Sequence, residues 1–299
     1  MSGQVPSPEP RHVSVLPAEV RELLAPMPGQ TVVDATVGAG GHALMLAEQV
    51  GPSGRVIGLD RDAAMLELAR RRLAGLPVTL IQANFDRLRE VLDGLGVEAV
   101  EGVLADLGLC SDQLDAAERG FSFQQTGPLD MRLDPAEDEP AGALLRRLNE
   151  RDLADLFWQL GEERFSRRIA RKIVETRRRA PLETTEQLAD LVRRCVPRPR
   201  GRRQAIDPAT RVFQALRIAV NDELGALDQL LAALPGCLKS GGRAVVISFH
   251  SLEDRRVKNA FRDRGHWDVL TRKPVQAGDE EVRHNPRARS AKLRAARRN

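Results

Sequence analysis

The chain has 299 residues, of which 42% are hydrophobic, and it carries a formal net charge of +4. This composition supports a folded core and excludes a globally disordered chain, and no apolar run approaches the roughly 20 residues of a membrane helix. The three cysteines, Cys110, Cys195 and Cys237, form no Cys-x-x-Cys pair, so neither a zinc site nor a disulfide framework is indicated.

Residues 1–11 are polar and rich in proline, without the basic start and apolar stretch of a secretory signal. We expect a flexible leader and a cytoplasmic protein. Short apolar runs then predict buried strands at 31–35, 55–60, 78–83 and 100–107, with helices at 40–50 and 62–74. This alternation predicts a parallel sheet covered by helices on both faces.

From about residue 114 to 207 no strand is convincing, and helical spacing covers 141–148, 151–160, 162–178 and 185–195. After Pro208 a helix pattern continues to about Leu234. A strong strand at 241–249, a helix from Leu252 and two edge strands at 267–272 and 290–297 complete the chain. The pattern predicts one α/β domain, residues 12–113 and 208–299, with an all-helical domain inserted at 114–207.

Basic residues gather in two stretches. Residues 164–203 hold fourteen basic and four acidic side chains, and residues 283–299 hold seven basic side chains and no acidic one. Such clusters attract phosphate backbones. Runs of charged residues are also common on solvent-exposed helix faces. Charge alone therefore leaves open both nucleic-acid binding and an ordinary solvated surface.

The first predicted strand ends in DATVGAGGH, residues 34–42, and a helix follows. Glycines such as Gly38 and Gly40 permit unusual dihedral angles and close approach of a ligand. Asp60, about 20 residues further on, ends the second strand and suits hydrogen bonds to ribose hydroxyls. These features predict a nucleoside cofactor but fit both NAD and S-adenosylmethionine, since Ala43 is allowed at the third position of the dinucleotide fingerprint.

Three residues favour S-adenosylmethionine. Asp34 precedes the glycine turn and can reach a methionine amino group, Phe85 follows the third strand and can contact adenine, and Asp106 ends the fourth strand. Each residue also has a purely structural interpretation: Asp34 as a helix cap, Phe85 as a core residue and Asp106 as a turn former. Their shared position at strand carboxyl ends, where ligands bind in open α/β sheets, favours the functional interpretation.

Several long segments resemble the bacterial 16S ribosomal RNA (cytosine-N(4))-methyltransferases, and the resemblance extends over nearly everything from His12 onward. The segments are DATVGAGGH, DLGLCSDQLD (106–115), ERGFSF (118–123), GPLDMR (127–132), GEERFSRRIA (161–170), ATRVFQALRIAVNDEL (209–224), ISFHSLEDR (247–255) and NPRARSAKLR (285–294).

The resemblance implies a class I, Rossmann-like methyltransferase sheet with an inserted helical substrate-recognition domain. It implies transfer of a methyl group from S-adenosylmethionine to the N(4) amino group of a cytidine in the decoding region of 16S rRNA, within the small ribosomal subunit. No metal is expected, and a homodimer is left open. The cofactor contacts it implies fall on Gly40, Gly41, His42, Asp60, Phe85, Asp106 and Gln113, and the glycine turn adds Gly38.

The chain departs from the common family pattern DLGVSSPQLD at Leu109, Cys110 and Asp112. Asp112 in place of proline puts the geometry of the loop before Gln113 in doubt. Cys110 raises the alternative of a cysteine nucleophile and methylation of a ring carbon. Because the family uses serine at this position, we expect Cys110 to be dispensable.

The expected reaction needs an acceptor that localises the lone pair of the cytosine amino nitrogen, and the candidate is Asp106 or a backbone carbonyl beside it. His250, just beyond the fifth strand, either relays the released proton or is a structural histidine of its turn. The target base must leave any stack. With no tyrosine, two tryptophans and eight phenylalanines, recognition through phosphates and RNA shape is expected over a stacking platform.

Three other classes stay open at this stage. An NAD-dependent oxidoreductase would use the same glycine turn. A DNA amino-methyltransferase would carry a (D/N/S)PP(Y/W) motif, but the chain has no Pro-Pro pair and no tyrosine. A non-catalytic RNA-binding protein would not need the intact glycine turn or Asp60.

Overall fold

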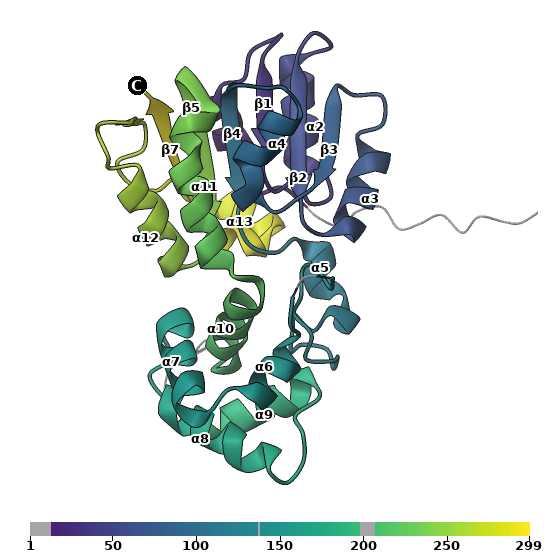
Figure 1. Ribbon diagram of the computed structural model, residues 1–299, viewed down its shortest axis with the longest axis vertical. Coiled ribbons are helices and arrows are strands. Elements are labelled where there is room, and N and C mark those ends of the chain that lie inside the picture. Colours follow the sequence, from purple (N-terminus) through teal and green to yellow (C-terminus); the bar gives the residue numbers. More distant parts are fainter. Residues whose placement is uncertain (1–12, 137, 198–206) are drawn as a thin grey trace, which may run out of the picture. The chain divides into compact units, whose positions relative to one another are not determined.

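The computed structural model describes residues 13–136, 138–197 and 207–299 (Figure 1). The expected leader at 1–11 lies outside the described residues. The chain forms two compact units. The first contains the chain up to Asp112 and from Gly225 onward, and the second is Gln113–Leu224.

Within the described residues, the first unit is built on a seven-stranded sheet in the order β3-β2-β1-β4-β5-β7-β6. Strands β1 to β5 are parallel, whereas β7 is antiparallel to both β5 and β6. The strands are β1 Thr31–Asp34, β2 Arg55–Asp60, β3 Val78–Gln82, β4 Val100–Asp106, β5 Leu238–Ser248, β6 Trp267–Val269 and β7 Lys292–Arg298.

Helices cover both faces of this sheet (Figure 1). Side chains alternate along β4, so that Val103 and Ala105 join the core under α4, α11 and α12, while Leu104 joins the core under α1, α2 and α3. Because the parallel strands are buried on both faces, they appear in the sequence as continuous runs of apolar residues. The helices of this unit are α1 Pro17–Leu24, α2 Gly41–Val50, α3 Ala63–Arg72, α4 Leu88–Gly94, α11 Glu223–Cys237, α12 Ser251–Ala260 and α13 Asp279–His284, with short 3-10 turns at Phe85–Arg87 and Pro286–Ser290.

The second unit is helical in its described residues, as the sequence predicts. Helix α7 packs against α8 and α10, and α9 packs against α8 and α10. Helix α8 buries Ile169, Ala170 and Ile173 and exposes Arg167 and Arg171, the one-sided pattern of a surface helix. The helices are α5 Ser111–Asp115, α6 Ala141–Arg147, α7 Glu150–Gly161, α8 Ser166–Arg177, α9 Thr185–Cys195 and α10 Ala209–Asn221, with a 3-10 turn at Ala117–Arg119.

The expected domain boundary at residue 207 differs from the observed one. Residues 209–221 form α10, which packs on α7 and α9 and therefore belongs to the helical unit, which ends at Leu224. The apolar spacing after Pro208 shows that a helix forms, but not which core its apolar face joins.

Two expected helices are also interrupted. The pattern predicted at 208–234 is divided into α10 and α11 at Asp222, whose φ is 46°. The pattern predicted at 162–178 begins only at Ser166, because Glu162 has a φ of 49° and ends α7. A left-handed residue interrupts the helical hydrogen bonds. Neither position is a glycine, so the sequence offered no signal for these breaks.

No helix among the described residues is both long and apolar enough to cross a membrane.

Candidate functional site: a carboxylate-rich sheet edge

The strand order reverses between β1 and β4, because the chain runs outward to β2 and β3 before returning to β4. The carboxyl ends of strands at such a switch point form the usual ligand crevice of an open α/β sheet. Asp34, Asp60 and Asp106 are the last residues of β1, β2 and β4. The structure therefore brings three of the predicted acidic residues to one edge of the sheet.

The glycine turn after β1 has two different physical requirements. Gly38 and Gly40 have φ angles of 50° and 86°, which favour glycine. A Cβ on Gly40 would lie 3.1 Å from Leu73, and a Cβ on Gly41 would lie 2.2 Å from the Ser14 hydroxyl. Gly40 and Gly41 therefore pack closely against their neighbours, and their cofactor contacts stay predictions.

Gly38 instead faces open space. A Cβ there would meet no neighbouring atom closer than 4.0 Å, and the nearest side chain would be that of Cys110. A ligand can approach the backbone at this point. Of the predicted turn residues, Gly38 is therefore the one whose surroundings suit direct contact with a cofactor.

Asp60 is held beside that turn by two backbone donors. The Gly38 amide donates to one carboxylate oxygen at 2.8 Å, and the Asp62 amide donates to the other at 2.9 Å. Burial raises the pKa of Asp60 to about 6, although both amides oppose the shift. Each oxygen keeps further acceptor capacity, which fits the two hydroxyls of a ribose.

Asp34 and Asp106 lie at the ends of adjacent strands, and His42 contacts Asp106. Nε2 of His42 is 3.4 Å from Oδ2 of Asp106. Thr36 links the two strand ends, because its amide donates to Asp34 at 3.2 Å and its hydroxyl accepts from the Asp106 amide at 2.6 Å. The group is rigidly connected by backbone hydrogen bonds.

Two oxygens in this group are buried without a hydrogen-bond partner in the described part of the chain, Oδ2 of Asp34 and Oδ1 of Asp106. An unsatisfied buried acceptor is costly, so these oxygens fit a site that receives donors from a ligand. The ammonium group of a bound methionine moiety and the amino group of a base are donors of that kind. The residues present therefore fit S-adenosylmethionine.

The charges in this group depend on each other. Burial would lower the pKa of His42, but Asp106 and Asp34 outweigh it, and the pKa of His42 is raised above its ordinary value. Burial raises the pKa of Asp34 to about 6, with His42 opposing the shift.

Phe85 is the first residue of the short 3-10 turn that follows β3. The side chain of Asn84 accepts a hydrogen bond from the Phe85 amide at 2.9 Å. The ring of Phe85 is partly buried and packs against the core beneath α4 and α11. This packing is the core interpretation considered from the sequence. The partly exposed ring leaves the adenine contact a prediction.

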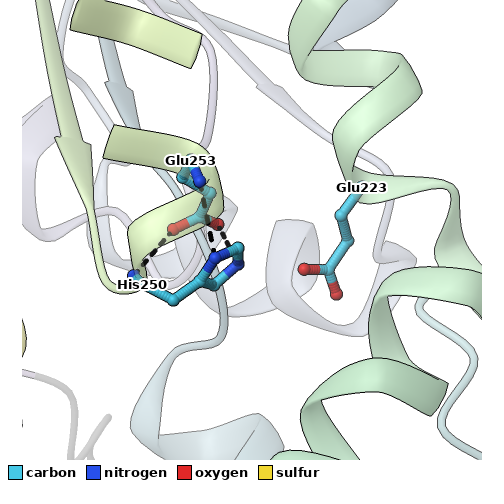
Figure 2. Close-up of side chains that lie close together, drawn as sticks. All are labelled: Glu223, His250 and Glu253. Atoms are coloured by element: carbon cyan, nitrogen blue, oxygen red, sulfur yellow. Dashed lines mark hydrogen bonds and ion pairs between the residues drawn. The ribbon is translucent and has the colours of Figure 1, made fainter. Parts of the chain in front are cut away.

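His250 is the N-cap of α12, directly after β5 (Figure 2). Its Nδ1 accepts from the Glu253 amide at 3.4 Å, and its Nε2 lies 3.2 Å from Oε1 of the Glu253 carboxylate. The same carboxylate accepts from the amides of Phe249 and His250. Both ring nitrogens thus face Glu253, which supports the structural interpretation of His250, and the proton relay stays a prediction.

Two further expected positions lie at the end of the first unit and the start of the second. Cys110 is partly buried, and its thiol lies 3.3 Å from the sulfur of Met65 in α3. Gln113 is the first residue of the second unit, and its cofactor contact stays a prediction. Sequence reasoning missed Thr36 and Glu253, although both lie inside the recognised segments DATVGAGGH and ISFHSLEDR.

The sheet order and the site together define a class I methyltransferase fold. The chain belongs to the MraW methylase family, whose model matches residues 9–299. The cofactor of a site with this fold and family is S-adenosylmethionine, as expected from the sequence.

Curated relatives are similar over almost the whole chain. A protein of Sorangium cellulosum named ribosomal RNA small subunit methyltransferase H is 52% identical, covering 98% of this chain and 93% of its own length. A protein of the same name from Geotalea uraniireducens is 49% identical, covering 95% and 97%. Among solved structures, an rRNA methylase from Streptococcus thermophilus is 11% identical with a TM-score of 0.44, covering 94% and 93%.

Proposed function

We propose that this protein transfers a methyl group from S-adenosylmethionine to the exocyclic N(4) amino group of a cytidine in the decoding region of 16S rRNA. The observation that carries the proposal is the buried, unpartnered oxygen of Asp106 at the switch point of the sheet. The relatives named as small-subunit rRNA methyltransferases support the substrate class. Such a substrate belongs to the cytoplasm.

Asp106 is the proposed catalytic residue. When bound, the cofactor supplies a methyl group already activated on a sulfonium sulfur. The amino nitrogen of cytosine is a poor nucleophile because its lone pair is delocalised into the ring. A carboxylate that accepts a hydrogen bond from that amino group localises the lone pair and orients it. For this role, the Thr36 hydroxyl holds the backbone amide of Asp106, and His42 lies against its carboxylate.

The helical unit is proposed to hold the RNA. Helix α8 presents exposed cations along one face, of which Arg171 pairs with Glu150 and Lys172 pairs with Glu175. Contacts of this kind bind phosphates without reading bases. The cations of residues 198–203 that contributed to the predicted basic stretch lie outside the described residues. The exposed face consists of Arg167, Arg168, Arg171, Lys172 and Glu175.

Methylation of a ring carbon through Cys110 is the competing reaction. That reaction needs a thiolate aimed at the base, whereas the Cys110 thiol lies against the sulfur of Met65. We expect Cys110→Ser to keep at least half of the wild-type turnover, measured as methyl incorporation into small subunits. A covalent RNA–protein adduct that depends on Cys110 would contradict this expectation.

The proposed function is tested by mass spectrometry of nucleosides from small-subunit rRNA. Cells lacking the gene should lose N(4)-methylation of one cytidine, and the wild-type gene should restore it, whereas an Asp106→Ala gene should not. Unchanged methylation at that cytidine in the deletion strain, or loss of 5-methylcytidine in its place, would overturn the proposal.

A further inference from the structure

A second concave surface lies away from the carboxylate edge, next to α12 and β7 in the first unit. It encloses about 730 Å³ beside the last strand of the sheet. We name it the edge pocket. Its lining residues are Lys258, Phe261, Arg262, Arg264, Trp267, Asp268, Val269, Thr271, Arg272, Arg294, Arg297 and Asn299.

The lining is strongly cationic. It contains one lysine and five arginines against a single carboxylate, that of Asp268. Asp268 pairs with Arg297 at 2.6 Å, and Arg294 pairs with Asp254 beneath α12 at 2.6 Å. The four remaining cations form no ion pair with the described residues: Lys258, Arg262, Arg264 and Arg272.

The floor of the pocket is fixed. The rings of Phe261 and Trp267 are buried and pack at 5.2 Å between centroids. Arg294, only 7% exposed, is held by its pair with Asp254. Of the unpaired cations, Lys258 lies in α12, Arg262 and Arg264 lie in the turn between α12 and β6, and Arg272 lies just after β6.

Like charges gathered without partners repel each other, so the arrangement suits a site for anions. Arg262, Arg264 and Arg272 are exposed and not enclosed, which suits an extended chain of phosphates better than one small buried anion. Guanidinium groups bind phosphate oxygens in a bidentate manner.

The edge pocket is separate from the carboxylate site. β6 is three strands away from β4, which ends in Asp106, and strands are spaced about 4.8 Å apart, so the separation is on the order of 14 Å. Its strand residues Arg294 and Arg297 pair with Val246 and Arg243 of β5, so the separation from Asp106 runs across the strands of the sheet. Phosphates bound there belong to nucleotides other than the target.

We propose that the edge pocket is a binding site for the phosphate backbone of the substrate RNA, in addition to the helical unit. The proposal rests on the proposed function for the identity of the RNA. It differs from the expectation drawn from residues 283–299, because the unpaired cations come mainly from residues 258–272, which the sequence analysis did not single out.

The test compares two triple variants of the full chain. Arg262→Gln/Arg264→Gln/Arg272→Gln removes three cations from the edge pocket. The control, Arg21→Gln/Arg70→Gln/Arg71→Gln, removes three exposed cations from α1 and α3. Binding to isolated small ribosomal subunits is measured across a series of salt concentrations, and binding of S-adenosylhomocysteine is measured by calorimetry.

We expect the edge-pocket variant to bind subunits at least tenfold more weakly at 0.1 M salt. Its slope of log affinity against log salt should be shallower by about two to three, since each phosphate contact contributes roughly 0.7 to 0.9. Its affinity for S-adenosylhomocysteine should stay within twofold of wild type. Equal binding to wild type, or an equal loss in the control variant, overturns the proposal.

Further measurements distinguish RNA from two other ligands of the edge pocket, a second copy of the chain and a small phosphate. Sedimentation that changes from dimer to monomer in the edge-pocket variant alone would assign the pocket to self-association and overturn the proposal. Saturable binding of inorganic phosphate that the variant loses, with unchanged subunit binding, would assign the pocket to a small phosphate ligand. If wild type binds subunits through the pocket but methylates no rRNA, the proposed function fails and the edge pocket stands.

Discussion

At the scale of single residues, the site depends on carboxylates whose surroundings differ. Asp106 and Asp34 each have a buried oxygen without a hydrogen-bond partner in the described residues, whereas both oxygens of Asp60 accept a backbone amide. The first two are arranged to receive donors from ligands, and the third is already oriented by the glycine turn. This difference predicts separate consequences of substitution.

Replacement of Asp106 should separate catalysis from stability. We expect Asp106→Ala to lower turnover on small subunits by at least 100-fold, because loss of one preorganised partner of a reacting group typically costs a factor of 100 to 1000. Asp106→Asn, which keeps the shape and one acceptor, serves as the matched variant and should retain the wild-type melting temperature. Turnover near wild type in Asp106→Ala would show that another group activates the amino nitrogen.

The raised pKa values of Asp34 and Asp60, both about 6, predict pH-dependent cofactor binding. The ionised carboxylates accept the donors of the cofactor, so affinity for S-adenosylhomocysteine should fall as the pH is lowered from 7 to 5, approaching tenfold per pH unit for each of the two groups below its pKa. The measurement is calorimetry at each pH. Asp34→Asn should bind more weakly at pH 7 and show a shallower profile, and an unchanged profile in this variant would contradict the role of Asp34.

The raised pKa values of Asp34 and Asp60 affect folding stability with the opposite dependence on pH. The folded-state pKa of each group is raised above the value of about 3.9 in an unfolded chain. Their contribution to stability is therefore fully present below about pH 4 and is lost as the pH rises through about 6. Protonation of these two carboxyl groups therefore does not itself destabilise the fold at low pH, and the melting temperature measured at each pH separates a loss of binding from a loss of structure.

At the scale of elements, the start of α12 is fixed by reciprocal capping between His250 and Glu253 (Figure 2). The Glu253 side chain is buried and accepts two backbone amides, those of Phe249 and His250. The turn after β5 thus keeps its shape without help from a ligand.

The capping arrangement predicts the behaviour of His250 variants. His250→Ala should destabilise the protein by about 1 kcal/mol, the usual cost of a lost N-cap, seen as a lower melting temperature. His250→Asn should restore the cap and keep at least half of the wild-type turnover. A 100-fold loss of turnover in His250→Asn at an unchanged melting temperature would instead establish the proton relay.

At the scale of the whole molecule, one unit carries the sheet and its carboxylate edge, and the other is helical. The cofactor fits the first unit, and the exposed cations of α8 and of the edge pocket offer phosphate contacts on both units. The proposed function therefore assigns cofactor binding to the first unit and phosphate contacts to both.

Ligand-induced stabilisation distinguishes the cofactor classes. S-adenosylhomocysteine at 100 times its dissociation constant should stabilise the protein by about 2.7 kcal/mol, and NAD at the same concentration should leave the melting temperature unchanged. Calorimetric scanning of the full chain measures both. Stabilisation by NAD would favour an oxidoreductase, and no response to either ligand would favour a non-catalytic RNA-binding protein.

Local patterns in the sequence were sufficient to predict the strands, the glycine turn, and Asp34, Asp60 and Asp106 at strand ends. These features depend on neighbours along the chain. The spacing of apolar residues, every two residues in a strand and every 3.6 in a helix, and the residue preferences of turns both act over a few residues. The resemblance to one family supplied the reaction and its cofactor, which periodicity and spacing had left open.

Tertiary contacts decided the rest. The helix expected to run on to Leu234 stops near Asn221, whose buried amide bonds the backbone of Met131 and Leu133, about 90 residues earlier in the chain. The contact of His42 with Asp106 likewise joins distant segments. Partners separated by so many residues leave no trace in local spacing, since only packing of the folded chain determines which polar groups become buried together.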